Sequence, residues 1–577
     1  NIQGRMRYER GEEHWVHNAY ASSVGNLYPM GRMKDNRYFS DQLYGDVLVG
    51  YNHTFNDFSL SATAGSSFTK TKTSHVDLWG EGSQFSQPGS GNIFYPNIFT
   101  PNNYYGNMST VGKDDNWMTQ KRLNSVFATA QLGYREGIFL DISARNDWSS
   151  ALAFTESCSF FYPSFGGSVL LNKFVDMGKN IDLFKFRASY SIVGNDVPVF
   201  MSNLLYSLGS QGAITPPDKA PFRTLKPEKT HSLEIGFDGT FLQNRLNINL
   251  TYYKTNTKNQ FFSVAAPYES GLRNRYVNAG NVENKGFEIS LNHRNNVGDL
   301  YYHVGVNATF IKNELTEVNG SRDEWQGFNP HAKGTITYAK TGHSIGYFNL
   351  IKTDGVFQSQ QEIDAYVDKN GNKIQPNAQP GDLRFVDYNG DGKIDNNDRQ
   401  DVGSAFPKVN LGVSLGAEWK GLDLNMFFDG NFGNKIYNAQ YYSTVYNEST
   451  GNQYAERMNS WTENNHSDIP RCLFGTSDPN GTNWGYTDRW LENGSFLRLK
   501  TLELGYTLPK VWVSKAGLQN VRVYTAMENL FTITDYKGYT PDLGMVDADG
   551  AGTSGGSGVM TRGCDDGRYP MARTITF

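Results

Sequence analysis

Acidic and amide side chains recur at alternate positions in segment 387–398, a spacing that suits a bound metal ion. The candidate ligands are Asp387, Asn389, Asp391, the main-chain carbonyl of Lys393, Asp395 and Asp398. Calcium is a hard cation that prefers roughly six to eight oxygen ligands, and this spacing wraps oxygens around one point. Gly392 stands where such loops turn sharply, while aspartate in place of glutamate at the last position predicts weak binding. The sequence predicts a structural Ca²⁺ site, with a bare Asn/Asp/Gly turn as the alternative.

Tryptophans in the polar connecting segments are the other residues that could contact a ligand. They could stack on sugars or on peptide side chains, or they could pack the loops together. These residues are Trp79, Trp325, Trp461, Trp484 and Trp490. The sequence does not identify ligand-binding residues beyond this group.

Catalytic motifs are missing from the sequence. It contains no His-Glu-x-x-His, no Walker loop and no Cys-x-x-Cys pair. A net charge of −5 gives no basic stripe for nucleic acid. We therefore predict that the protein is not an enzyme and has no nucleic-acid partner.

The segments between these loops alternate strictly between apolar and polar residues. Leu246, Ile248, Leu250 and Tyr252 share one face of a strand whose other face carries asparagine and threonine. Segments 138–145 and 422–429 repeat this pattern. Such a sheet separates a dry environment from a wet one, as the wall of a membrane β-barrel does. The aromatic content of 14% suits the two interfacial girdles of a barrel.

Short turns and long polar loops also alternate along the chain. Predicted hairpins pair 46–55 with 58–69, 125–134 with 138–145, 162–171 with 183–192, 231–241 with 246–255, 286–294 with 300–311, 410–419 with 422–432, and 495–506 with 521–531. Ile2–Tyr8 and Tyr569–Phe577 bring the total to roughly sixteen strands, an even number as bacterial barrels favour. Long loops outside and short turns in the periplasm would place Phe577 on the periplasmic side. The fold class is thus all-β, a large antiparallel transmembrane barrel.

One strand breaks the alternation. In Phe496–Leu504 the alternation of apolar and polar residues shifts by one position near Lys500. If Arg498 or Lys500 faced lipid at mid-depth, each would destabilise the barrel by about 2–4 kcal/mol. We expect a β-bulge there, or a position outside the bilayer. Cysteine is scarce, and a disulfide between Cys472 and Cys564 is one possible pairing in an oxidising compartment.

Several motifs together resemble the SusC/RagA family of TonB-dependent outer-membrane transporters, in the family's order along the whole chain. They are Arg145-Asn146-Asp147-Trp148 with Tyr162-Pro163-Ser164, Leu225-Lys226-Pro227-Glu228, Asn278-Ala279-Gly280-Asn281, Asn284-Lys285-Gly286-Phe287-Glu288, Gly381-Asp382-Leu383, Ser495-Phe496-Leu497-Arg498, Leu504-Gly505-Tyr506, Asn529-Leu530-Phe531 and Tyr569-Pro570.

The resemblance implies a 22-stranded barrel of which residues 1–577 are the β-barrel domain. An N-terminal plug, a TonB box and about six strands would precede Asn1. The implied function is active import of glycans or oligopeptides across the outer membrane of a Gram-negative bacterium. Its implied partners are a SusD-like lipoprotein lid, the TonB–ExbB–ExbD complex and membrane lipid, in a dimer of transporter–lid pairs. From their length, we expect loops 315–407 and 434–494 to make much of the lid contact.

A second interpretation stays open on the residues alone. A secreted, calcium-dependent carbohydrate-binding or adhesive β-protein would also explain the content of glycine, asparagine and aromatic residues. It would not explain strands with one lipid-compatible face.

Overall fold

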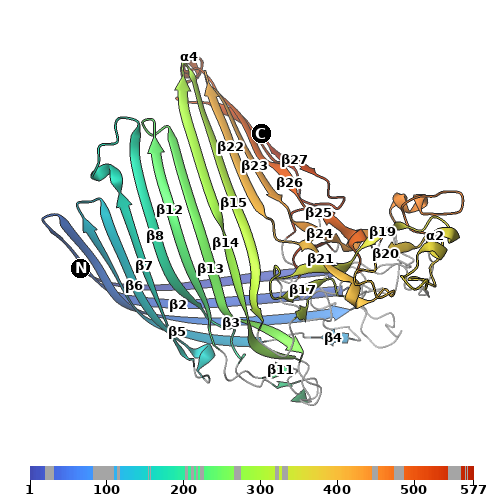
Figure 1. The fold of residues 1–577 in the computed structure, drawn as a ribbon. Helices are drawn as coiled ribbons and strands as arrows, with labels where there is room; N and C mark the ends of the chain where they lie inside the picture. Colours follow the sequence, from blue (N-terminus) through green and yellow to red (C-terminus); the bar gives the residue numbers. More distant parts are fainter. Residues whose placement is uncertain are drawn as a thin grey trace, which may run out of the picture.

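A long antiparallel sheet forms most of the protein (Figure 1). The computed structural model describes residues 1–577 except 20–31, 82–99, 101–109, 113–116, 154, 156, 202–205, 209–213, 216–218, 221–225, 266–273, 319–323, 328–334, 443, 445–452, 473–485, 544–560, 566 and 568–569. Within the described ranges no helix is both long and apolar enough to cross a bilayer.

Sixteen strands of this sheet pair in chain order. They are β1 (Ile2–Ala19), β2 (Arg32–Phe55), β3 (Phe58–Glu81), β5 (Trp117–Tyr134), β6 (Ile138–Ser149), β7 (Ser159–Leu170), β8 (Ile181–Asn195), β12 (Glu228–Phe241), β13 (Leu246–Ala265), β14 (Asn274–Val297), β15 (Leu300–Val318), β22 (Val409–Trp419), β23 (Leu422–Phe432), β26 (Phe496–Thr507), β27 (Arg522–Thr534) and β29 (Thr574–Thr576). The short β4 (Thr110–Gly112) and β11 (Lys219–Ala220) join its margin. No pairing between β1 and β29 occurs in the described part of the chain.

The predicted hairpins are all present, and most strands run further than their predicted ends. The turn at Asn56 and Asp57 joins β2 to β3 with a positive φ at Asn56, and Lys420 and Gly421 join β22 to β23 in the same way. The connection from β7 to β8 includes a short 3₁₀ helix, Leu171–Lys173. Short turns thus alternate with long connections, as the sequence predicts.

The two faces of the sheet differ as a membrane wall requires. On β2, Val47 and Val49 are about half exposed at 57% and 52%, while Asp46, which points to the opposite face, is 6% exposed. The cross-strand register keeps the apolar residues together, since Val49 lies opposite Ala64 and Tyr51 opposite Ala62. Apolar side chains therefore cover the outward face, and polar side chains cover the inward face.

The predicted irregularity at Lys500 is a β-bulge. On β23, Phe427 pairs with Thr501 and Phe428 with Leu499, so Lys500 has no opposite residue. The pairing of β26 with β27 shifts at the same point. One extra residue thus restores the alternation of apolar and polar residues on both sides of the bulge.

Three long connections fold together at the end of the sheet opposite α4 (Lys510–Val513), as Figure 1 shows. We call their described residues within 335–407, 434–494 and 535–567 the loop module. It contains β17 (Thr337–Lys340), β18 (Tyr347–Ile351), β21 (Arg399–Ser404), β19 (Thr353–Val356), β20 (Leu383–Phe385), β24 (Lys435–Asn438), β25 (Leu491–Asn493), β28 (Cys564–Asp565), α2 (Gln360–Ala365) and α3 (Ala439–Tyr441). The preceding β16 (Glu324–Gln326) pairs with β17.

Apolar side chains from all three connections form the core of the loop module. Phe348 and Leu350 of the first connection, Tyr437 and Trp490 of the second and Cys564 of the third are each at most 1% exposed and share one cluster. A second cluster joins Ile351, Leu383 and Phe385 to Trp461. Burial of this extent indicates that the loop module is a packed unit, although its chain segments are connections between strands.

Candidate functional site

Charged groups on the inward face form compact networks along the wall. The Arg145 side chain donates from Nε to Asp147 at 2.8 Å and from Nη2 to the Ser125 hydroxyl at 2.8 Å. Further round the wall, Arg187 bonds to Asp238 at 3.4 Å and to Thr251 at 2.5 Å. A lumen lined in this way is wet and polar.

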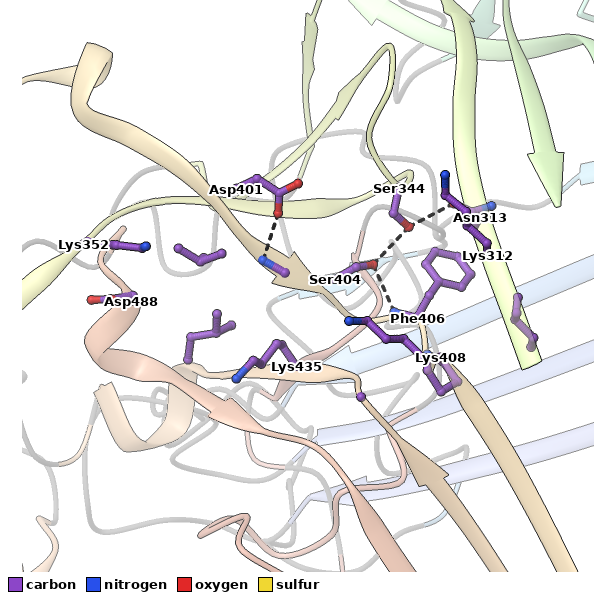
Figure 2. A pocket seen from close by; sticks show the side chains of 16 residues that line it. Lys312, Asn313, Ser344, Lys352, Asp401, Ser404, Phe406, Lys408, Lys435 and Asp488 are labelled. Carbon is purple, nitrogen blue, oxygen red and sulfur yellow. Dashed lines mark hydrogen bonds between the residues drawn. The ribbon is translucent and has the colours of Figure 1, made fainter. Parts of the chain in front are cut away.

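A pocket of about 700 Å³ lies where the loop module meets the ends of the wall strands (Figure 2). Its lining comes from residues 311–313 of β15, Ser344, Lys352 and segments 401–408, 433–435 and 488–491. The bridging contacts are polar: Ser344 donates to Asn313 at 3.0 Å and bonds to Ser404 at 3.1 Å. These bonds tie the loop module to β15.

Lysine side chains dominate the charge of this pocket. Lys312, Lys352, Lys408 and Lys435 line it, against Asp401 and Asp488. Asp401 pairs with His343 at 2.7 Å, and Lys312 pairs with Glu314. No ion pair to Lys352, Lys408 or Lys435 occurs among the residues that the structure describes. Ammonium groups without carboxylate partners suit an acidic group of a ligand.

Asp488 is the least solvated acid of the pocket. Its Oδ1 accepts hydrogen bonds from the Thr353 amide at 2.9 Å and from the Thr353 hydroxyl at 2.8 Å. Burial raises the pKa of the Asp488 carboxyl above its usual value, and the bonds from Thr353 act in the opposite direction. Protonation of Asp488 would make the pocket more positive.

The predicted calcium ligands form a tight turn in the loop module. Asp387 accepts hydrogen bonds from the amides of Gly390 and Gly392, each at 2.8 Å, and Gly392 has the positive φ expected of a sharp turn. The carboxylate of Asp398 is fully buried and accepts from the amides of Tyr388 and Asp395.

The remaining predicted ligands bind the backbone in the same manner. Asn389, Asp391 and Asp395 accept from the amides of the residues two positions later, Asp391, Lys393 and Asn397. Within the described ranges, no three acidic, histidine or cysteine side chains converge to hold a metal ion. The donor set is therefore occupied by backbone amides here, and calcium binding stays a prediction.

Two of the five loop tryptophans belong to the core of the loop module. Trp490 is 1% exposed, and Trp461 is 9% exposed with its indole N–H donating to Gln358. They pack the loops together, which is the interpretation that the sequence favours over ligand stacking. The side chains of Trp79 and Trp325 and all of Trp484 lie outside the described residues.

The suggested disulfide between Cys472 and Cys564 does not form. Cys472 is exposed and its thiol contacts Ser460 and Arg457, whereas Cys564 is buried in the core of the loop module. The two cysteines therefore have different surroundings.

The lysine pocket was not foreseen from the sequence. Its residues come from six separate stretches of the chain, and single lysines are ordinary surface residues. Only the folding of the loop module against β15 brings them together.

Comparison with known proteins identifies the family to which this architecture belongs. The sequence model of the family described as TonB dependent receptor-like, beta-barrel matches residues 2–372. TonB-dependent receptor P3 of Formosa agariphila is 29% identical over 546 residues, covering 91% of this chain and 51% of the relative. TonB-dependent receptor SusC of Bacteroides thetaiotaomicron is 26% identical over 377 residues, covering 62% of this chain and 35% of SusC.

Solved structures agree on the fold. The RagAB peptide transporter structure superposes with a TM-score of 0.77 at 21% identity, over 100% of this chain and 59% of that one. The chain thus spans about half the length of the curated relatives that it matches.

Proposed function

Because the chain belongs to the TonB-dependent receptor family of outer-membrane β-barrels, we propose that it forms the barrel of a SusC/RagA-like importer. The proposed cargo is a glycan or an oligopeptide, and the proposed energy source is the TonB–ExbB–ExbD complex acting through a plug. The observation that carries the proposal is the wall itself: sixteen strands in chain order with an apolar outward face and charged inward networks. Such a wall encloses an aqueous path through lipid.

The loop module is the proposed seat of a SusD-like lipoprotein lid. It is packed and therefore presents a fixed surface, and it includes both long loops singled out from the sequence. Large side chains stand out from it: Tyr388 is 62% exposed, Met458 is 88% exposed and Tyr539 is 60% exposed. Exposed aromatic and methionine side chains are common anchors of protein interfaces.

The pocket beneath the loop module supports contact with a cargo that carries acidic groups. Lys352, Lys408 and Lys435 supply three ammonium groups, and a carboxylate or sulfate would pair with them. We propose that this pocket contributes one subsite to a larger cargo path.

Purification from native outer membranes in mild detergent tests the proposed function. We expect a surface lipoprotein and a bound glycan or peptide to co-purify, both identified by mass spectrometry. A protein that is soluble without detergent and that captures sugars with calcium would instead support the secreted adhesive alternative.

Point variants test the lid surface more sharply than deletion of a loop, since segment 434–494 contributes Tyr437 and Trp490 to the core. Met458→Asp with Tyr539→Asp should reduce lipoprotein capture at unchanged barrel assembly. Val511→Asp is the matched control, because Val511 is 69% exposed at the opposite, short-turn end. Full capture by the double variant would remove the loop module from the lid interface.

A further inference from the structure

The outward face of three adjacent strands carries its residues in ordered lateral rows. On β13, β14 and β15, the cross-strand register aligns Tyr252, Phe287 and Phe310 in one row. The rings of Tyr252 and Phe287 lie 5.1 Å apart, and Phe287 and Phe310 are 57% and 43% exposed. Exposed aromatic rows on a membrane barrel mark the interface between hydrocarbon and headgroups.

The next outward row on the side of the long loops consists of lysines alone. Lys254 lies opposite Lys285, and Lys285 lies opposite Lys312. Two residues of a strand advance about 7 Å, and strand tilt reduces the gain in depth. The three ammonium groups therefore stand a few ångströms outside the aromatic row, at the level of lipid phosphates.

Like charges directly opposite each other on a sheet repel, so the lysine row is stable only with anionic groups nearby. Two such groups, Glu283 and Glu314, lie in the next outward row on the side of the long loops. Glu283 pairs with Lys254 at 2.9 Å and with Lys285 at 2.8 Å, and Glu314 pairs with Lys312 at 2.8 Å. An ammonium group has three donors, so each lysine keeps hydrogen-bonding capacity. The lysine side chains remain 44%, 37% and 65% exposed.

A second lysine pair lies four residues further along the strands, on the side of the long loops. Lys229 of β12 stands opposite Lys258 of β13 on the same outward face, and neither has an ion-pair partner among the described residues. Five lysines thus share the outward face of four adjacent strands with three glutamates, Glu283, Glu314 and Glu317. The excess positive charge lies beside the apolar band of an outer-membrane protein.

We propose that this lysine row and the Lys229–Lys258 pair bind the phosphate groups of an outer-leaflet lipid. The lipid chains would lie along the aromatic row while the phosphates bridge lysines that otherwise repel one another. Glu283 orients Lys254 and Lys285 by its ion pairs with them. It also lowers the affinity of the row for phosphate, because it competes for the same ammonium groups. This site depends on the membrane location of the barrel, and Lys312 is the one lysine that it shares with the lining of the lysine pocket.

Native mass spectrometry of the detergent-solubilised protein tests this site. The probes are diphosphoryl lipid A and the same lipid with its phosphates removed. We expect the phosphorylated lipid to bind and the dephosphorylated lipid to bind much more weakly. Lys254→Gln, Lys285→Gln and Lys312→Gln should each weaken binding about fivefold, in line with the attraction of one lysine to an anionic surface.

Matched controls carry the same loss of charge at the short-turn end. Lys173 and Lys420 lie in short turns there, and Lys173→Gln with Lys420→Gln should leave lipid binding unchanged. Glu283→Gln should strengthen lipid binding, and this result tests the proposal even if a lysine variant assembles poorly.

Three results would overturn the proposal. They are equal affinity for both lipids, equal loss in the control variants, and complete displacement by millimolar inorganic phosphate, which would show a site for the free ion.

Discussion

Asp382 and Arg471 lie 89 positions apart in the chain and form a bidentate ion pair inside the loop module, with distances of 2.5 and 3.2 Å. The Asp382 side chain is fully buried, and the Arg471 side chain is 20% exposed. The Arg471 amide also donates to the Gly381 carbonyl at 2.8 Å. The pair therefore joins two of the three connections that build the loop module.

Removal of Arg471 leaves a buried carboxylate without its counter-charge. Arg471→Met is expected to destabilise the loop module by about 3–5 kcal/mol. Amide hydrogen exchange in segments 381–385 and 459–471 of the assembled protein measures this loss. Lys373→Met, which breaks the exposed pair with Asp364, is the control and should change nothing measurable.

The bulge at Lys500 fixes which residues of β26 face lipid. Lys500 is the residue without an opposite partner, so its deletion would let Thr501 follow Leu499 in a regular ladder and would leave Leu502 and Leu504 on the lipid side. We expect this deletion to assemble into the barrel, as judged by heat-modifiable migration in gels. Insertion of one alanine after Leu502 would instead turn Glu503 to the lipid side and Leu504 to the lumen, and should prevent assembly. Failure of the deletion together with normal assembly of the insertion would contradict this role of the bulge.

Asp488 gives the loop module a dependence on pH. Its folded-state pKa is raised above the usual 3.8 by burial, so the protonated form is favoured by folding. The contribution of Asp488 to the free energy of unfolding is therefore fully present below the usual aspartate pKa. It is lost as the pH rises through the raised pKa of the folded state. Exchange of the Thr353 amide, corrected for its intrinsic rate, should accelerate over that window. In Asp488→Asn the acceleration should disappear; if it persists, another group is responsible.

Calcium at 387–398 is open to direct titration. With aspartate at the last position and backbone amides on the same oxygens, we expect binding on the order of 10⁻⁴–10⁻³ M, the range of extracellular modules. Isothermal calorimetry on the purified protein measures it. Asp391→Asn should weaken binding, since it removes a charge without removing the turn, while Asp364→Asn should not. Absence of heat at millimolar calcium would leave the bare turn as the correct interpretation.

The fold could be predicted because barrel strands carry a local signal. A period of two and a short turn are both readable within a few residues, so hairpins such as 46–55 with 58–69 are found without tertiary information. The bulge at Lys500 was visible for the same reason: one inserted residue shifts the apolar phase of a single strand.

The loop module could not be predicted in this way. Its core joins Phe348, Trp490 and Cys564, which belong to three connections, and no local pattern marks them as neighbours. Packing of the loops by Trp461 and Trp490 could be expected in general, but no local pattern identifies the residues that they contact. The lysine pocket could not be predicted for the same reason, since Lys352 and Lys435 line one pocket only when the connections fold onto β15.

The parallel pairing of β24 with β28 has a consequence for cooperativity. Tyr437 lies opposite Cys564, and Asp565 accepts a hydrogen bond from the Tyr536 hydroxyl, so the segment between β27 and β29 completes the core that the earlier connections begin. One stretch of chain therefore contributes to the core of the loop module and also leads into β29, which pairs with β27 at only three positions. The last strand of the wall and the loop module are thereby linked through the chain as well as through packing.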